Sequence, residues 1–309
     1  RVKGAILSTL DGGNSWQPSE LSFVPNSFFA LDDSFLWAVS DRGEIWSSAE
    51  SGKDWKKLTR KENALRVHFL DAQRGFLVGR KKTLMRTEDG GKTWAHVPEA
   101  AQVLGDADDF VYRRADFWNG KIGIVSGGIE EEETRPRRRG ADLPAWMEPE
   151  VAGFRGSSPH VMVNLETRDG GKTWTKQEVS GFGYLHRAVI GSDGQGLSLI
   201  KFSKSFTYGG ELYSFHANGK KGELIIRTKE LELQDIVYIP GDGAYLACTE
   251  RLGILPVPTK VRIKYSKDLK TWVDLQVDYR AAAQSVVLSS TPSGKVFAAL
   301  DQGTILALQ

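Results

Sequence analysis

The chain of 309 residues contains one cysteine and no long apolar run. The lone Cys248 cannot form an internal disulfide, and the alternating segment 244–248 around it indicates a buried strand rather than a reactive thiol. No stretch of about 18 apolar residues is present, so the sequence predicts no transmembrane helix. The formal net charge of +2 gives no overall attraction to nucleic acid, which we therefore do not expect as a partner.

Motifs for metals and nucleotides are also missing from the sequence. The five histidines include no pair at metal-ligand spacing, and there is no cysteine–histidine cluster. Segment 90–93, Gly-Gly-Lys-Thr, superficially resembles a phosphate loop, but no helix follows whose N-terminus could hold a phosphate. We therefore expect no metal and no cofactor.

Glycine is abundant, with 33 residues, and much of it falls in a recurring turn. The turn at 87–94 reads Thr-Glu-Asp-Gly-Gly-Lys-Thr-Trp, and four further copies end in the same way. The repeated tryptophans are Trp16, Trp55, Trp94, Trp174 and Trp272, and the first three lie 39 residues apart. Repeats of about 40 to 50 residues with strand patterning indicate a β-propeller.

The composition of this turn has a physical explanation. Its aspartate can accept hydrogen bonds from backbone N–H groups ahead of it, while consecutive glycines supply the positive φ of a tight reversal. The tryptophan then begins the next strand and covers the turn. Because the copies occupy one structural position, they indicate a staple between strands rather than metal ligands or catalytic acids. The aspartates are Asp11, Asp89, Asp169 and Asp268.

The repeats predict an all-β protein with one propeller domain over residues 1–309. Each blade should contain an inner, a second, a third and an outer strand, with the repeated turn joining the third strand to the outer one. We count six blades, with the ring closed by strands from both ends of the chain. Segments 4–7 and 303–306 both read as third strands. A seven-bladed ring completed by preceding residues is therefore the alternative.

The turn resembles the Asp-box, or bacterial neuraminidase repeat. The wider unit at 75–94, together with the phrases Asp-Arg-Gly-Glu-Ile-Trp at 41–46 and Asp-Gln-Gly-Thr-Ile-Leu at 301–306, resembles the repeat of photosystem II stability and assembly factors. This resemblance implies a noncatalytic scaffold with an arginine-rich surface for a protein partner. Sialidases share the Asp-box, which implies a hydrolase of acidic glycans as the alternative.

Aligning the repeats reveals recurring arginines. If Phe69, Phe117 and Ile190 are equivalent, arginine stands three residues before each of them. The inner strands of a propeller line its axis, so we expect these side chains to converge in a funnel at one face. Two further arginines stand at similar strand starts. The resulting candidates for anion binding are Arg66, Arg113, Arg114, Arg187 and Arg280.

Clustered guanidinium groups suit carboxylate or phosphate, so the funnel indicates an anionic partner. We expect a protein segment, with an acidic glycan as the second choice. If Asp116 and Asp235 neutralise the arginines, the cluster is instead a network of salt bridges, and that reading stays open. Asp235 stands at the position equivalent to the arginines, one blade further on.

A charged insertion spans 129–160. It joins an acidic block at 130–133 to a basic block at 135–139. Such a run is either a solvated loop or an arm over the funnel that extends the basic patch and anchors a partner. The residues that would contact a partner are Arg137, Arg138, Arg139 and Trp146.

Taken together, the sequence favours a monomeric binding scaffold over an enzyme. The retaining hydrolase alternative needs a tyrosine nucleophile beside a glutamate and a positioned acid, and no such set is evident. Its only candidates are Tyr184, Tyr208, Tyr238, Glu211 and Asp235, each of which also suits a structural role. The chain begins at Arg1 rather than Met. We therefore expect an exported protein (periplasmic, lumenal or extracellular) whose signal or anchor has been removed.

Overall fold

The computed structural model describes residues 4–9, 11–129, 160–191, 194–202, 208–216, 220–252, 257–278, 280–291 and 294–308. Within these ranges the chain is almost entirely β-structure, with a single short helix, α1 (Pro98–Ala101). None of the described helices is long and apolar enough to cross a membrane.

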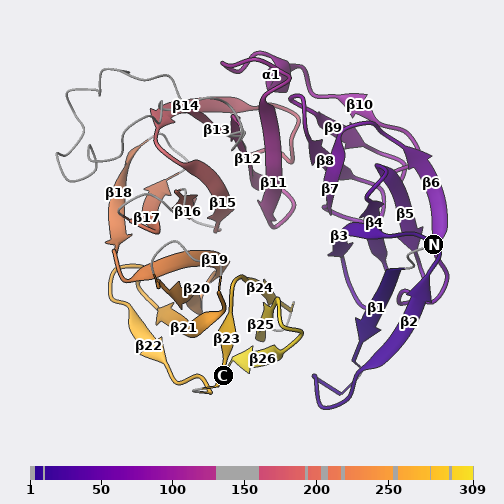
Figure 1. The fold of residues 1–309 in the computed structure, drawn as a ribbon. Coiled ribbons are helices and arrows are strands. Elements are labelled where there is room, and N and C mark those ends of the chain that lie inside the picture. Colours follow the sequence, from indigo (N-terminus) through magenta and orange to yellow (C-terminus); the bar gives the residue numbers. More distant parts are fainter. Residues whose placement is uncertain are drawn as a thin grey trace.

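Six sheets of three or more strands form the blades of a ring around a central axis, as the repeat count predicts (Figure 1). The first two blades are β3 (Pro25–Ala30), β4 (Leu36–Ser40), β5 (Glu44–Ser48) and β6 (Lys56–Arg60), then β7 (Ala64–Phe69), β8 (Gly75–Gly79), β9 (Leu84–Thr87) and β10 (Ala95–His96). The next two are β11 (Phe110–Trp118), β12 (Ile122–Ile129), β13 (His160–Thr167) and β14 (Thr175–Gly181), then β15 (Tyr184–Ile190), β16 (Gln195–Lys201), β17 (Gly210–His216) and β18 (Lys220–Arg227). The fifth contains β19 (Leu231–Ile239), β20 (Gly243–Glu250), β21 (Thr259–Ser266), β22 (Val273–Leu275) and β23 (Ala282–Ala283), and the sixth contains β24 (Val286–Ser290), β25 (Val296–Leu300) and β26 (Ile305–Leu308).

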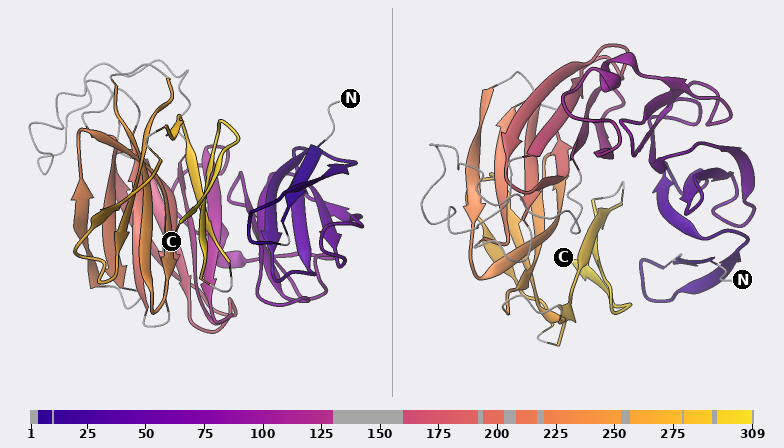
Figure 2. Two further views of the ribbon diagram at one scale, coloured as in Figure 1. Left: turned by 90° about the horizontal axis from the view of Figure 1, so that it is seen from below. Right: turned by 45° about the horizontal axis from the view of Figure 1, so that its top comes forward.

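The two ends of the chain do not share a sheet, so the closure differs from the expected joint blade. β1 (Gly4–Ser8) pairs only with β2 (Gln17–Leu21) among the described strands, while β26 pairs with β25. Figure 2 shows the β1–β2 hairpin and the C-terminal sheet as separate parts of the ring. The hairpin turn instead rests on the C-terminal sheet, since a Cβ added to Gly13 would lie 3.6 Å from Cε1 of Phe297.

Both faces of most blades are covered by their neighbours, which explains why the second strands are almost continuously apolar. All five residues of β8 are buried. Aromatic rings bridge adjacent blades, because Trp37 stacks on Phe69 at 3.7 Å and Phe76 stacks on Phe117 at 5.0 Å between ring centroids. One hydrophobic cluster therefore joins the first and second blades, and another joins the second and third.

The repeated turn closes on itself through hydrogen bonds. In the copy at 87–94, Asp89 Oδ1 accepts the N–H of Thr93 at 2.9 Å, and Thr87 Oγ1 accepts the N–H of Gly91 at 3.0 Å. The indole of Trp94 donates to the carbonyl of Gly91 at 2.9 Å. The hydroxyl of Thr93, which donates to Asp89 Oδ2 at 2.6 Å, and the N–H of Thr93 lower the pKa of Asp89 to about 2, so its carboxylate is engaged by its own turn.

The other copies follow this plan with one informative exception. The indoles of Trp16, Trp55 and Trp174 donate to a glycine carbonyl three residues earlier, at 2.9–3.1 Å. In the shortened copy at 266–272, Leu269 replaces a glycine and adopts a positive φ of 61°. The buried indole N–H of Trp272 lacks a hydrogen-bond partner among the described residues, because the shorter turn brings no carbonyl beneath it.

Candidate functional site

The inner strands of five blades share an irregularity in register close to their start. A β-bulge of this kind turns the next side chain away from the regular pleat. The residues that follow the irregularity are Ser27, Arg66, Arg114, Arg187 and Asp235. The three arginines therefore occupy one position in three adjacent blades, and Asp235 occupies it in the next.

These arginines influence one another electrostatically across the blades. Desolvation lowers the pKa of Arg66, and the positive charges of Arg187 and Arg113 lower it further against the opposing effect of Asp235. Desolvation likewise lowers the pKa of Arg114 to about 10, with Arg187 and Arg66 adding to the effect. Four guanidinium groups from three blades therefore share one electrostatic environment.

Arg187 is neutralised within the protein. Its Nη1 donates to both carboxylate oxygens of Asp235 at 2.9 Å and to the carbonyl of Leu288 at 3.3 Å. Asp235 is only 1% exposed and also accepts the N–H groups of Ile236 and Leu288, each at 2.9 Å. Burial alone would raise the pKa of Asp235, but Arg187 and Arg114 hold it below its usual value. This cluster ties together β15, β19 and β24.

Arg66 and Arg114 differ from Arg187, because the side chain of neither forms an ion pair or a hydrogen bond with any residue that the structure describes. The nearby carboxylate of Asp116 accepts the backbone N–H of Ile190 at 3.2 Å instead. Arg66 is solvent-accessible and Arg114 is half-buried. The two guanidinium groups thus keep hydrogen-bonding capacity that no described residue uses.

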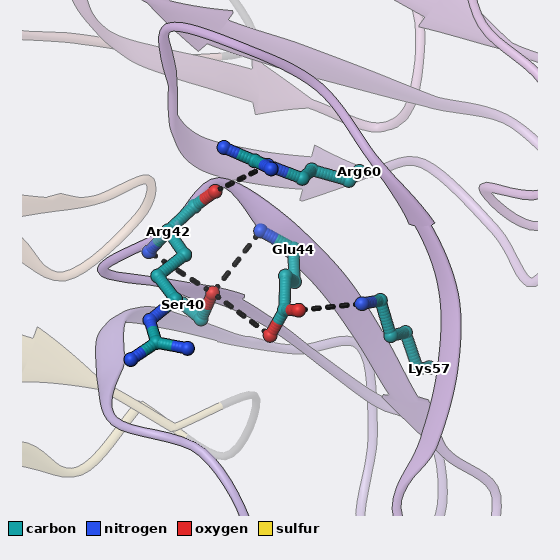
Figure 3. A network of polar contacts seen from close by, with 5 residues as sticks. All are labelled: Ser40, Arg42, Glu44, Lys57 and Arg60. Atoms are coloured by element: carbon teal, nitrogen blue, oxygen red, sulfur yellow. Dashed lines mark hydrogen bonds and ion pairs between the residues drawn. The ribbon is translucent and has the colours of Figure 1, made fainter.

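On the first complete blade, a network of polar contacts shows charged side chains that are paired with one another (Figure 3). There Lys57 donates to Glu44, and this contact lowers the pKa of the glutamate. Ser40 accepts the N–H of Glu44 at 3.0 Å, and Arg60 donates through Nε to the carbonyl of Arg42 at 3.1 Å. The charges of Lys57 and Glu44 therefore neutralise each other locally, unlike those of the two axial arginines.

The other two arginine candidates have different surroundings. Arg113 lies at the irregularity of β11, with its guanidinium 4.7 Å from the centroid of the Tyr184 ring, and its charge acts on Arg66. Arg280 does not stand at an inner strand start, because β23 follows it and pairs with β21. It forms an exposed ion pair with Asp278 at 2.7 Å. In the last blade, Val287 holds the position that arginine has in β7, β11 and β15.

The insertion candidates Arg137, Arg138, Arg139 and Trp146 lie outside the described residues. The described ends of the insertion are nevertheless informative. Ile129, at the end of β12, pairs with Phe110 at the start of β11, four residues before Arg114. The insertion therefore leaves the blade at the same face as the axial arginines.

Sequence reasoning found Arg113 at the irregularity of β11 but missed the residues at the equivalent places in the next two blades. His186 stands there in β15, and desolvation, with help from Lys201, lowers its pKa to about 3. In the next blade Gln234 accepts a hydrogen bond from Lys201 at 3.1 Å and donates to Thr249 at 2.9 Å. The same alignment would have found both residues, since each directly precedes the aligned Arg187 or Asp235.

The structure also contains a tyrosine–glutamate pair that the sequence did not suggest. Tyr213 donates to Glu211 at 2.8 Å, and Arg227 donates to the same glutamate at 2.6 Å. Burial and the glutamate raise the pKa of Tyr213, which is opposite to what a nucleophile requires. The pair lies on the third strand β17, two strands away from the axis, so it does not form a hydrolytic site with the arginines.

Comparisons with known proteins agree with this fold. Residues 49–128 match the family model described as photosynthesis system II assembly factor YCF48. The photosystem II assembly lipoprotein Ycf48 of Synechococcus sp. (strain CC9902) is 27% identical over 213 residues, which are 63% of this chain. The match spans 60% of that relative's length.

Solved structures share the architecture at low identity. A structure of YCF48 bound to D1 peptide superposes with a TM-score of 0.63 at 14% identity, covering 98% of this chain and 86% of that one. A GH74 xyloglucanase from Xanthomonas campestris gives 0.59 at 13% identity, over 99% and 50% of the two chains. The propeller of the Trilobed protease from Pyrococcus furiosus, described as having an open velcro topology, gives 0.54 at 13% identity over 99% and 90%. The chain is therefore a six-bladed β-propeller similar to the photosystem II assembly factors, as its Asp-box repeats indicate.

Proposed function

We propose that this chain is a monomeric, noncatalytic scaffold that captures an anionic protein segment, and that Arg66 and Arg114 bind its carboxylates. The similarity to assembly factors supports a binding role, and a solved relative is bound to a peptide. The curated relative is a lipoprotein, which supports an exported location. A protein segment is favoured over a glycan because one solved relative is bound to a peptide and the curated relative is a photosystem II assembly lipoprotein.

One observation carries the proposal. Arg114 is half-buried and partly desolvated, Arg66 is solvent-accessible near it, and the side chains of both form no ion pair among the described residues, whereas Arg187 is satisfied by Asp235. Uncompensated desolvation of a charge costs free energy, and a carboxylate ligand would offset that cost. Arg113 adds a further positive charge that acts on Arg66, and such a concentration of charge attracts anions.

Binding of matched peptides tests this function. The probe is a fluorescent peptide with four glutamates, compared with the same peptide carrying glutamines. We expect Arg66→Ala and Arg114→Ala each to weaken binding of the acidic peptide by about tenfold, as for loss of a charge-assisted contact. Raising the ionic strength should also weaken it. Arg280→Ala is the matched control, because Arg280 is an exposed arginine paired with Asp278 and does not stand on an inner strand.

Two results would refute the proposal. The first is equal affinity for the acidic and the neutral peptide, which would exclude carboxylate recognition. The second is equal weakening by Arg280→Ala and Arg114→Ala, which would show only a general effect of net charge. Steady product release from a fluorogenic sialoside, abolished by Arg114→Ala, would favour the hydrolase alternative instead.

A further inference from the structure

The joint between the third and fourth blades differs in composition from its neighbours. Clusters of nine or more buried apolar side chains join the first blade to the second, the second to the third, the fourth to the fifth and the fifth to the sixth. Among the described residues, the cluster that joins the third blade to the fourth has only three buried members, which are Ile124, Ala188 and Ile190. We name this joint, between β11–β14 and β15–β18, the polar seam (Figure 1).

Three polar side chains of the third blade lie on the face that meets the fourth. Ser126 and Asn164 are directly paired across β12 and β13, and Glu166 stands two residues after Asn164. Residues two apart on a strand share a face of the sheet. Glu166 is also paired with Ile124, which packs against β15. The side chains of Ser126, Asn164 and Glu166 therefore all belong to the polar seam.

One oxygen of each of these side chains lacks a hydrogen-bond partner among the described residues. The atoms are Ser126 Oγ, Asn164 Oδ1 and Glu166 Oε1, and all three are buried. Ser126 is 1% exposed and Glu166 is 6% exposed. An amide oxygen and an ionised carboxylate only accept hydrogen bonds, so with Glu166 ionised these atoms comprise two pure acceptors and one hydroxyl. A buried acceptor without a donor costs free energy.

The charged groups around the seam leave Glu166 uncompensated. Burial raises the pKa of Glu166 above its usual 4.5, and the exposed Arg168 opposes this rise without forming an ion pair with it. On β17, Glu211 is already bound by Tyr213 and by Arg227 of β18. β12 and β14 place no titratable side chain on this face. The other titratable or charged groups beside the seam are Arg114 and Asp116 on β11 and His186 and Arg187 on β15, and none of them contributes to the pKa shift of Glu166.

We propose that Glu166 is protonated within the polar seam and donates a hydrogen bond to Asn164, so that one proton closes the joint between the third and fourth blades. The proton converts an acceptor into a donor and thereby satisfies both side chains. Residues two apart on a strand are roughly 6.5 Å apart, which a glutamate side chain can span. No pocket is needed, because the bound species is a proton from solvent.

The seam is therefore a pH-sensitive joint in a ring whose other joints are apolar. When the pH rises and the proton leaves, an uncompensated carboxylate remains between two blades, and the seam loosens. A carboxyl group whose folded-state pKa is raised stabilises the fold below its unfolded-state pKa, and this contribution is lost as the pH rises through the folded-state value. The inference is independent of the proposed binding function, because no ligand takes part.

Infrared difference spectroscopy on the complete protein tests for the proton directly. At about pH 5.5 most exposed carboxyl groups are ionised, so a C=O band of a protonated carboxyl group identifies a buried one. We expect this band in the wild-type protein and its loss in Glu166→Gln. In Asn164→Leu the band should persist but shift to higher frequency, because the carboxyl group loses its acceptor. Glu223→Gln is the matched control, because Glu223 is an exposed glutamate on β18 and its removal should leave the band unchanged.

Hydrogen–deuterium exchange measures the loosening of the seam. At about pH 8, after correction for the intrinsic pH dependence of exchange, the amides of β13 should exchange about tenfold more slowly in Glu166→Gln than in the wild-type protein. Glutamine keeps a donor in the seam without a charge. At about pH 4.5 the two proteins should exchange alike, because both then carry a neutral side chain at this position.

Three results would overturn the proposal. If Glu166→Gln retains the carboxyl band, the proton is not on Glu166. If the band is unshifted in Asn164→Leu, Asn164 is not its acceptor. If Glu166→Gln slows exchange equally at both pH values, the substitution acts through packing and the joint does not respond to a proton. None of these results bears on the binding of acidic peptide by Arg66 and Arg114, so the two proposals can fail separately.

Discussion

Replacing Arg114 with methionine should stabilise the unliganded protein while weakening capture of the acidic peptide. The pKa of Arg114 falls from 12.5 to about 10 in the folded state, because its desolvation and the charges of Arg187 and Arg66 disfavour the guanidinium ion. One pKa unit corresponds to about 1.4 kcal/mol, so about 3 kcal/mol is the upper bound. Because the side chain is half-buried and water screens part of this cost, we expect a gain of roughly 1 kcal/mol.

Urea unfolding measures this gain, and a thermal melt should show a rise of about 2 °C for a protein of this size. Methionine keeps the apolar stem of arginine, so the packing contribution is largely retained. The gain should shrink in high salt, because salt screens the repulsion among Arg66, Arg114 and Arg187. Arg280→Met should show no gain, since Arg280 is exposed and paired with Asp278.

A loss of stability in Arg114→Met would refute this reasoning. It would show that Arg114 satisfies a structural contact in the folded protein, so that its charge is not held in reserve for a ligand. An unchanged affinity of Arg114→Met for the acidic peptide would also refute the reasoning. Greater stability without a loss of binding would mean that the axial charge is incidental.

Three further predictions concern the turns and the buried charges. Trp94→Ala should cost about 3–5 kcal/mol in urea unfolding, because the indole is 8% exposed, whereas Trp16→Ala should cost less because that indole is 37% exposed. Asp235→Ala should cost about 3–5 kcal/mol, because it leaves the guanidinium of Arg187 buried without its partner, and a change below about 1 kcal/mol would contradict the ion pair. Glu166→Gln should stabilise the protein at pH 7 but not at pH 4, because burial raises the folded-state pKa of Glu166 above its usual 4.5. The wild-type protein therefore loses stability as the pH rises from 4.5 through that folded-state pKa, and an equal effect of the substitution at both values would contradict the shift.

The architecture could be predicted because the repeat marks it at regular intervals. The tryptophans and glycines of the turn mark one end of four of the six blades, and pairs such as Phe69 and Gly75 define the inner hairpin. That second frame is sufficient to align Arg66 with Arg114, and the register of the sheets reproduces the alignment. Where the blades are regular, the spacing of residues in the sequence is therefore sufficient to predict which positions are equivalent.

The same method failed where the blades are irregular. Arg280 precedes a short strand, β23, which resembles an inner strand start in sequence but pairs with β21 at the side of the fifth blade. The true inner strand, β24, presents Val287 at the aligned position. Whether a strand lies inside or beside a sheet depends on its hydrogen-bonding partner, which spacing alone does not specify.

The pairing of charges was equally beyond the sequence. Asp116 and Asp235 both seemed able to neutralise the arginines, yet only Asp235 binds one, and Asp116 accepts the N–H of Ile190. Asp235 follows a bulge, as the arginines do, so its side chain turns toward the neighbouring blade. Asp116 lies further along a regular stretch of β11 and has no such turn. Whether an aspartate neutralises an arginine here thus depends on whether it follows a β-bulge, and the sequence does not reveal the bulge.

The distribution of stabilising contacts explains how this propeller tolerates unpaired charge at its axis. The repeated turns follow the third strands, which run in the same direction as the inner strands, so they lie at the opposite end of the blades from Arg66 and Arg114. Each turn is closed by its own hydrogen bonds and its own tryptophan, as at 87–94. Folding therefore does not require the axial arginines to be satisfied internally, so Arg66 and Arg114 can serve the binding role that we propose for them without loss of the fold.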